Sequence, residues 1–581
     1  MTRMETIFAA LVVVGISSLP LPVQAQTIKV ILAGSSAQWQ EVALAAYKSG
    51  ACVSGGTAPC FHYTAKNFNL NDTRPTVKGG TTATDQGNIW IVWDSNTTST
   101  NVWAFIKVDS GVGVRCYYAQ PRCNINISTF PAAGNLIGSN IWGDNSTDST
   151  PPANVQSLFT SGTLLVNAAA TDIRPEDALF ATCRANSQLG GGVDGLAGLG
   201  YGTNSSGVCP KFGATLASLE GTDIKSAYPL STSTAHVVAF QLSGKDPFTG
   251  TNIPLGSTVT LGAAPIIFIT ARTGALASVT NATDAQLQQV FGGINCNASA
   301  FGSSFSGTIQ AYLREPLSGT MNTTEATVFR YPNASGVSQE TGVNAVNPLA
   351  SACASGGSRF RGVGTGEVVN WVLNSNADNG TDGIAYTFFS YGNVSSIANS
   401  ASYGYLTLNG VDGIFHRYGT TIDPGQPSIA GALPSTANLP ATCAGGAGSF
   451  PCAESKIWSG NLSFPNLRNG SYRAWSALRA VSNGTALASL QQLILGAQAY
   501  AVSTTPDFVP AVKQGTTDPG LALLRSHYTQ EGVAPVNIAT TGDKGGDMGG
   551  CILSSSGVVS TSDTTTKLAQ ALPDTGCVSV P

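Results

Sequence analysis

The feature that most constrains the fold of this sequence is a recurring junction between apolar β-prone runs and helical patterns. The run at residues 27–33 passes through a turn at Gly34 into an amphipathic pattern at 39–47. The runs at 102–108 and 308–313 end in similar turns rich in Gly and Ser. Strands that alternate with helices in this way predict an α/β architecture with a largely parallel or mixed sheet.

Other segments continue this alternation. No repeat of fixed period is visible, which disfavours a solenoid or a propeller. We expect strands at 88–93, 164–170, 236–242, 264–270 and 384–390, helices at 284–291 and over 474–502, and an insertion over 50–88.

Charged residues are scarce in this chain. They make up 10% of the sequence, whereas globular proteins average about 25%. The formal net charge is -4, so the chain lacks the basic surface with which proteins bind nucleic acid or anionic lipid. We expect no nucleic-acid partner.

The N-terminal residues have the pattern of an export signal. Arg3 precedes an apolar run at 7–19, and small residues at 23–25 form a cleavage motif that predicts processing after Ala25. Residue 26 is Gln rather than the Cys of a lipid-anchored precursor, and no later segment has the roughly 18 apolar residues of a membrane span. The sequence therefore predicts a periplasmic or secreted protein without a membrane anchor.

Twelve cysteines suit an exported chain, because disulfides persist in oxidising compartments. A metal site would need paired cysteines or histidines, and the four histidines lie far apart in the sequence. We expect no metal and no cofactor. The spacing of the cysteines predicts six local disulfides, which join Cys52 to Cys60, Cys116 to Cys123, Cys183 to Cys209, Cys296 to Cys353, Cys443 to Cys452, and Cys551 to Cys577.

Three strand-to-helix junctions carry small hydroxyl residues and glycines, at 35–37, 110–113 and 318–320. Such turns present backbone N–H groups and hydroxyls that an anion can use, although ordinary helix capping also explains any one of them. Arg314 precedes the third turn, and Asp172 follows another strand, in a chain with few charges. Together these residues predict an oxyanion site.

These motifs resemble the phosphate-binding periplasmic proteins of ATP-binding-cassette (ABC) importers. The strongest match is Arg314-x-x-x-Ser318-Gly319-Thr320, preceded by the segment at 290–295. The likeness extends over roughly residues 27–510, with further matches in family order at 33–37, 109–114, 169–172, 364–369 and 383–386.

The resemblance implies a fold and a division of the chain. The fold is the two-lobed type II arrangement of periplasmic binding proteins, with mixed sheets flanked by helices and insertions stapled by disulfides. The implied parts are the signal peptide (1–25), lobe 1 (26–235 and 384–515), lobe 2 (236–383) and a C-terminal tail rich in Gly, Thr and Asp (516–581).

The resemblance also implies inorganic phosphate, bound between the lobes, as the ligand. The Arg side chain offers a planar fork to an oxyanion, and the Asp accepts a proton that hydrogen phosphate has and sulfate lacks. At the position where the family usually has an Asp two residues after the Arg, this chain has Pro316, with Glu315 adjacent. The implied ligand contacts are Ser36, Ala37, Ser110, Asp172, Arg314, Ser318, Gly319 and Thr320.

The sequence thus favours a monomeric binding protein, not an enzyme, that captures phosphate for an ABC importer permease. Two alternatives stay open. One is a secreted surface or scavenging protein of the same fold that binds another oxyanion or a sugar acid. The other is a secreted phosphohydrolase, for which the sequence offers no metal cluster and no activated nucleophile.

Overall fold

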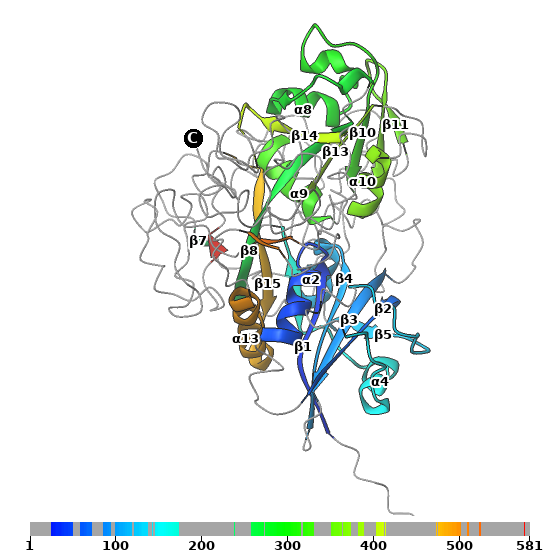
Figure 1. The fold of residues 1–581 in the computed structure, drawn as a ribbon, viewed down its shortest axis with the longest axis vertical. Helices are drawn as coiled ribbons and strands as arrows, with labels where there is room; N and C mark the ends of the chain where they lie inside the picture. The colour runs from blue at the N-terminus through cyan, green and yellow to red at the C-terminus, as the bar shows by residue number, and fades with distance from the viewer. Residues whose placement is uncertain are drawn as a thin grey trace, which may run out of the picture.

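The structure is a computed structural model of the chain (Figure 1). The description that follows covers part of the sequence. The described residues are 25–49, 59–71, 85–94, 99–118, 121–137, 142, 146–173, 237–238, 257–271, 274–314, 318–329, 350–362, 364–373, 382–388, 403–411, 413, 472, 474–500, 508–510, 522–524 and 574–575.

Within these ranges, 14 strands form one mixed sheet, whose main path runs β11-β12-β10-β13-β8-β15-β6-β1-β4-β3-β2-β5. Strand β14 pairs with β8 and with the short strand β9. The strands of this sheet are β1 (Ala25–Ser35), β2 (Cys60–Asn71), β3 (Asp85–Asp94), β4 (Ser99–Val108), β5 (Asn124–Asn126), β6 (Ala168–Thr171), β8 (Ser257–Ala271), β9 (Asn281–Ala282), β10 (Gln310–Arg314), β11 (Ala350–Ala352), β12 (Ser358–Gly362), β13 (Gly383–Phe388), β14 (Tyr403–Leu408) and β15 (Trp475–Ser482).

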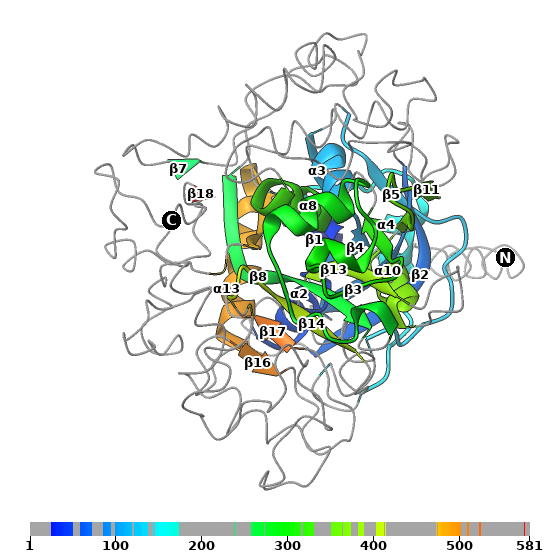
Figure 2. The same ribbon diagram turned by 90° about the horizontal axis from the view of Figure 1, so that it is seen from above.

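Helices alternate with strands along the chain and cover the sheet. Helices α2 and α13 pack side by side in the part of the molecule that holds β1 (Figures 1 and 2). The helices are α2 (Trp39–Leu44), α3 (Ser110–Tyr118), α4 (Ala153–Thr160), α8 (Asp284–Phe291), α9 (Gly319–Thr324), α10 (Thr365–Leu373) and α13 (Gly484–Tyr500), with π-helical turns after α2 (Ala45–Ser49) and after α9 (Glu325–Phe329).

Strand β8 joins two halves of the molecule (Figure 1). Its first part pairs antiparallel with β15, which also pairs with β6 and so belongs with β1 to β5. Its last part pairs antiparallel with β13 and β14, beside β10 to β12. We call the part with β1 to β6 and β15 the first half, and the part with β9 to β14 the second half. The predicted α/β class, with mixed sheets flanked by helices, is confirmed.

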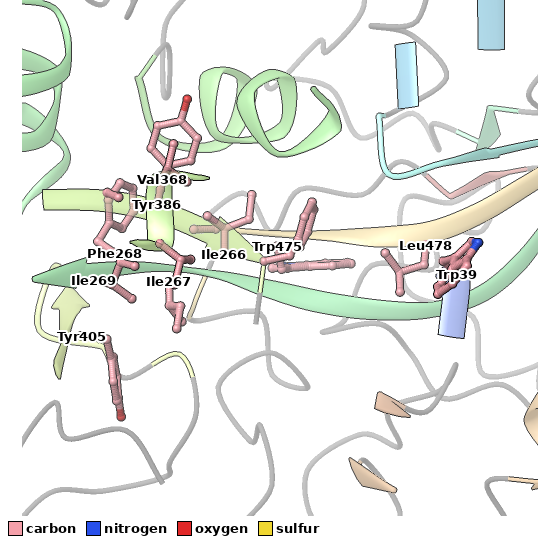
Figure 3. Close-up of a cluster of buried hydrophobic side chains, with 14 of the residues drawn as sticks. Trp39, Ile266, Ile267, Phe268, Ile269, Val368, Tyr386, Tyr405, Trp475 and Leu478 are labelled. Carbon is pink, nitrogen blue, oxygen red and sulfur yellow. The ribbon is translucent and has the colours of Figure 1, made fainter. Parts of the chain in front are cut away.

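A buried apolar cluster surrounds β8 (Figure 3). Residues 266–269 of this strand read Ile-Ile-Phe-Ile, and each is at most 1% exposed. A continuous apolar run of this kind is typical of a strand whose two faces are both covered. Trp475 and Leu478 of β15 and Tyr386 of β13 belong to the same cluster, so the core continues from one half into the other.

Residues 60–71, expected to belong to an insertion, form strand β2 of the sheet. It pairs antiparallel with β3, and the register shifts between Ala65 and Phe68. Asn67, in this bulge, has a φ of 62°, and Lys66 and Asn67 are both exposed. The bulge interrupts the alternation of buried and exposed residues from which a strand is predicted.

The longest helical pattern, expected within 474–502, is confirmed as helix α13 (Gly484–Tyr500), but the residues before it form a strand. Residues 475–482 form β15, which lies between β6 and β8, and the helix α13 begins only at Gly484, whose φ is 59°. Pairing on both edges satisfies the backbone of this segment, and such tertiary contacts override a weak helical preference. Of the strand expected at 236–242, the structure describes β7 (Val237–Val238), which pairs with β18 (Asp574–Thr575).

Two of the predicted disulfides lie wholly among the described residues, and both are confirmed. Cys116 pairs with Cys123 at a Cα–Cα distance of 4.9 Å, and Cys296 pairs with Cys353 at 5.8 Å. Cys60 is disulfide-bonded as well. The other predicted pairs have one or both partners outside the described residues. Across the described ranges, no helix is long and apolar enough to cross a membrane.

Candidate functional site

Three turns of the first half meet at one edge of the sheet. Strand β1 runs parallel to β4 and to β6, with Ser35 opposite Val108 and Gly34 opposite Ala170. Because these strands end together, the residues that follow them lie at the same edge, where ligands bind in open α/β sheets. This topology brings together Ser35, Asp109, Ser110 and Asp172, at the ends of β1, β4 and β6.

Asp172 is the centre of this group and is only 3% exposed. Its Oδ1 accepts a hydrogen bond from the Ser110 hydroxyl, and its Oδ2 accepts one of 3.3 Å from the Ser35 hydroxyl. Burial raises the pKa of Asp172 above its usual range, while the bonds from Ser110 and Ser35 and the charge of Arg314 act in the opposite direction. The carboxyl group is therefore held in place as an acceptor away from bulk water.

The second half repeats the arrangement at the ends of its own parallel strands. Strand β10 runs parallel to β12, with Arg314 opposite Gly362, and α10 begins at Thr365 just beyond. The Arg314 backbone N–H donates to Tyr386 Oη at 3.1 Å, and its Nη1 donates to Thr365 Oγ1 at 2.5 Å. Arg314 is 3% exposed, so its guanidinium is oriented by these contacts inside the protein.

An ion pair connects the two groups. Arg314 Nη2 lies 3.2 Å from Asp109 Oδ1, and the Asp109 side chain keeps 23% of its surface exposed. The carboxylate beside this arginine thus comes from the end of β4 in the first half. The positions adjacent to the arginine in sequence, Glu315 and Pro316, lie outside the described residues.

Helix α9 of the second half packs directly on Asp172. A Cβ atom on Gly319 would overlap Asp172 Oδ1 and would lie 2.5 Å from Ser110 Oγ. Thr323, one turn further on, donates from Oγ1 to the Asp172 carbonyl oxygen at 2.9 Å. Only glycine allows this approach, so Gly319 is required by the contact between the halves.

The structure brings six of the eight predicted ligand residues together as buried side chains or backbone: Ser110, Asp172, Arg314, Ser318, Gly319 and Thr320. Ser318 caps α9, since its Oγ accepts from the Met321 N–H at 3.3 Å. Ser36 is exposed and Ala37 is half-buried. The Ala37 N–H donates to Ser35 Oγ at 3.2 Å. The contact of each residue with a ligand stays a prediction.

Four residues of this region were missed as candidates. Ser35, Asp109 and Thr365 each lie at the end of a strand or the start of a helix, within motifs that the resemblance covers, so their position was a usable signal. Thr323 lies four residues after Gly319, which places both on one face of α9. We call the set of Ser35, Asp109, Ser110, Asp172, Arg314, Gly319, Thr323 and Thr365 the junction site.

The junction site combines donors and acceptors for a small oxyanion. The guanidinium of Arg314 and the hydroxyl of Thr365 can donate to anionic oxygens, and the hydroxyls of Ser35 and Ser110 can do so when they turn from Asp172 to the anion. The carboxylates of Asp109 and Asp172 can only accept, so they suit an oxyanion that carries hydrogen.

No protein-family model matches this sequence, and no curated protein matches it. Among solved structures, it is similar to an ABC-type phosphate transport receptor from Vibrio cholerae at 14% identity, covering 39% of this chain and 59% of that one, with a TM-score of 0.20. The chain therefore spans less than two thirds of that receptor.

Two further structures are similar over a larger share of the chain. A phosphate-binding protein from Stenotrophomonas maltophilia is 13% identical over 80% of this chain and 82% of that one, with a TM-score of 0.31. An ancestral soluble variant of the human phosphate binding protein is 12% identical over 86% and 91%, with a TM-score of 0.32. Likenesses of this size assign this chain neither a family nor a ligand.

Proposed function

We propose that this chain is an extracytoplasmic solute-binding protein that binds hydrogen phosphate at the junction site and delivers it to an ABC importer. The observation that carries the proposal is that residues of opposite halves meet there: buried Arg314 contacts Asp109, and Gly319 packs on Asp172 and Ser110. In a chain with 10% charged residues, charges buried at one junction indicate a binding role.

Ligand binding would favour one arrangement of the two halves relative to each other. Arg314 and Thr365 belong to the second half, and Asp109 and Ser110 to the first, so an anion placed among them would be held from both sides. A ligand that contacts both halves favours the arrangement in which they are together. Strand β8, which joins the halves, is the segment across which such a movement would take place.

Selectivity would come from the carboxylates. Hydrogen phosphate can donate a proton to Asp172 or Asp109, whereas sulfate, which carries none at neutral pH, would place its oxygens against carboxylate oxygens with no hydrogen between them. An unpaired acceptor in a buried site costs about 1–3 kcal/mol. We therefore expect phosphate to bind roughly 5- to 150-fold more tightly than sulfate.

The parts of the chain are assigned accordingly, as proposals. The signal peptide would end at Ala25, the mature protein would be a monomer, and no catalytic step is assigned to the junction site. Lobe 1 would hold the residues from 26 to 235. Because β13 and β14 both pair with the last part of β8 in the second half, we place the return to lobe 1 after β14 rather than at residue 384.

Isothermal titration calorimetry on ligand-free protein tests the proposal. Phosphate should release heat and raise the melting temperature, sulfate should do so far less, and Arg314→Lys should weaken phosphate binding because Lys lacks the planar fork. Arg122→Lys is the matched control, since Arg122 lies at Asn483, away from the junction site. A wild-type protein that shows neither heat nor a thermal shift with phosphate rejects this function.

A further inference from the structure

A second cluster of reactive side chains lies in the first half, on β2 and on the segment that begins at residue 146. His62 Nδ1 lies 2.7 Å from Asp148 Oδ1, and His62 Nε2 lies 2.7 Å from Ser146 Oγ. The side chains of His62 and Asp148 are 3% and 0% exposed, and Ser146 is partly exposed. The order is carboxylate, imidazole, hydroxyl, which is the order of a nucleophilic triad.

The contacts of Asp148 determine which nitrogen of His62 carries the proton. Asp148 Oδ2 accepts from the Thr64 backbone N–H at 3.0 Å and from the Thr64 hydroxyl. With its other oxygen also an acceptor, the carboxylate requires a hydrogen on His62 Nδ1. The Nε2 lone pair is then the acceptor for the Ser146 hydroxyl, as a general base requires.

Two aromatic rings hold the imidazole in this orientation. Trp142 stacks on His62 with ring centroids 4.1 Å apart and an interplanar angle of 19°. Tyr47 meets the ring edge-on, at 4.6 Å and 81°. The imidazole therefore cannot turn without losing both packing contacts, and the two rings give it apolar neighbours.

A purely structural histidine also needs partners for both ring nitrogens, and this cluster supplies them. What it adds is a partly exposed residue, Ser146, whose hydroxyl lies at Nε2, together with a fully buried carboxylate at Nδ1. Such an arrangement lets the serine reach a substrate while the carboxylate stabilises the imidazolium that forms. The cluster is separate from the junction site, because β3 and β4 lie between β2 and β1 in the sheet.

We propose that Ser146, His62 and Asp148 hydrolyse small carboxylic esters with apolar acyl groups. Ser146 Oγ attacks the ester carbonyl carbon while its proton passes to His62 Nε2. The bond from that carbon to the alkoxy oxygen then breaks, and the alkoxy group leaves as the alcohol with this proton. Water, deprotonated by His62, attacks the acyl-serine, releases the carboxylic acid and restores the Ser146 hydroxyl. Asp148 is a positioning residue.

Covalent labelling with diisopropyl fluorophosphate tests the nucleophile. Ser146 Oγ would form a bond to phosphorus, the phosphorus–fluorine bond would break, and fluoride would leave while the proton passes to His62. Mass spectrometry should find the adduct on Ser146 in the wild type and none on Ser146→Ala, and hydrolysis of p-nitrophenyl acetate should be lost with it. Ser157→Ala, on the exposed surface of α4, is the matched control and should label as the wild type does.

His62→Gln should slow labelling of Ser146 by at least about 100-fold, the contribution of a general base. Melting followed by circular dichroism identifies a variant that is unfolded, and Ser146→Ala tests the site without altering the buried ring. The absence of an adduct on Ser146 in the wild type overturns the proposal, as does an adduct that forms as fast in folded His62→Gln.

Asp148→Asn tests the positioning role. Because Thr64 donates twice to Oδ2, the amide oxygen of the substituted side chain would stay there and its NH2 group would donate to His62 Nδ1. The ring proton would then move to Nε2, and labelling should slow. The 15N chemical shifts of the His62 ring report this change of tautomer. A labelling rate that stays unchanged after the tautomer has changed contradicts the proposed role.

Discussion

Arg314 and Asp109 are 205 residues apart in the sequence, yet Arg314 Nη2 lies 3.2 Å from Asp109 Oδ1. The contact joins the end of β10 in the second half to the end of β4 in the first. The arginine is buried, and its guanidinium also donates to Thr365 Oγ1, from its own half. The ion pair therefore connects the two halves. It also orients the Arg314 guanidinium, which is the main hydrogen-bond donor of the junction site.

Asp109→Ala should destabilise the protein by about 1–3 kcal/mol, because a buried arginine loses a charged acceptor. The measurement is the free energy of unfolding by urea. Asp109→Asn keeps an acceptor oxygen for Arg314 and should lose less. An unchanged free energy of unfolding in Asp109→Ala would show that the pair does not hold the arginine.

Asp172→Asn should reduce the preference for phosphate over sulfate. The amide can donate to sulfate oxygens, which a carboxylate cannot do, so sulfate should gain affinity, while hydrogen phosphate should lose affinity because a neutral amide oxygen replaces the charged acceptor. Competition titrations of the two anions measure the ratio of affinities. A ratio equal to that of the wild type would show that Asp172 does not determine the selectivity between the two anions.

The same variant should change how stability depends on pH. Burial raises the pKa of Asp172 in the folded protein above its usual value of 3.8, so the folded state binds more protons than the unfolded state between these two values. The contribution of Asp172 to the free energy of unfolding therefore falls as pH rises from about 3.8 through the pKa of the folded state. Asp172→Asn should gain stability relative to the wild type over this interval and keep that gain at pH 7.

Glu41 offers a second test of buried carboxyl groups. It lies in α2, is 3% exposed, and burial raises its pKa well above 4.5. The sign is the same as for Asp172, so the folded protein loses stability as pH rises above about 4.5. Glu41→Gln should be more stable than the wild type at pH 7 and equal to it at pH 3, as thermal melting at the two pH values would show. A variant less stable at pH 7 would indicate that the ionised Glu41 has a stabilising partner.

Gly319→Ala should weaken the packing between the two halves and leave the fold of each half unchanged. Its Cβ would overlap the Asp172 carboxylate, and relief of such overlap costs about 1–3 kcal/mol, or roughly 5- to 150-fold in phosphate affinity. Gly366→Ala is the matched control, since a Cβ there has nothing within 4 Å. Equal phosphate affinities in the two variants would contradict the close approach of α9 to Asp172.

The strand ends of the junction site could be predicted from the sequence, because parallel strands bring the turns that follow them to one edge. Ser110 and Asp172 were identified from their places directly after strands and from the family resemblance. The partner of Arg314 could not, since it was sought next to the arginine in sequence and lies on a strand of the other half. Strand β2 was missed because the bulge at Asn67 interrupts its alternating pattern.

The cluster of His62, Ser146 and Asp148 had no sequence signal. His62 is separated from Ser146 by 84 residues and from Asp148 by 86, and Ser146 and Asp148 lie in a segment without regular secondary structure. No motif spacing relates such residues. Their meeting depends on how the chain after β5 returns to β2, which only tertiary structure determines.

A crystal structure of the protein grown with phosphate tests the central claim most directly. The account predicts tetrahedral density at the junction site, within hydrogen-bond distance of the Arg314 guanidinium, the Ser110 hydroxyl and the Asp172 carboxylate, with residues of both halves in contact with it. Phosphate bound elsewhere, with the Arg314 to Asp109 pair unchanged and the junction site without density, would contradict it.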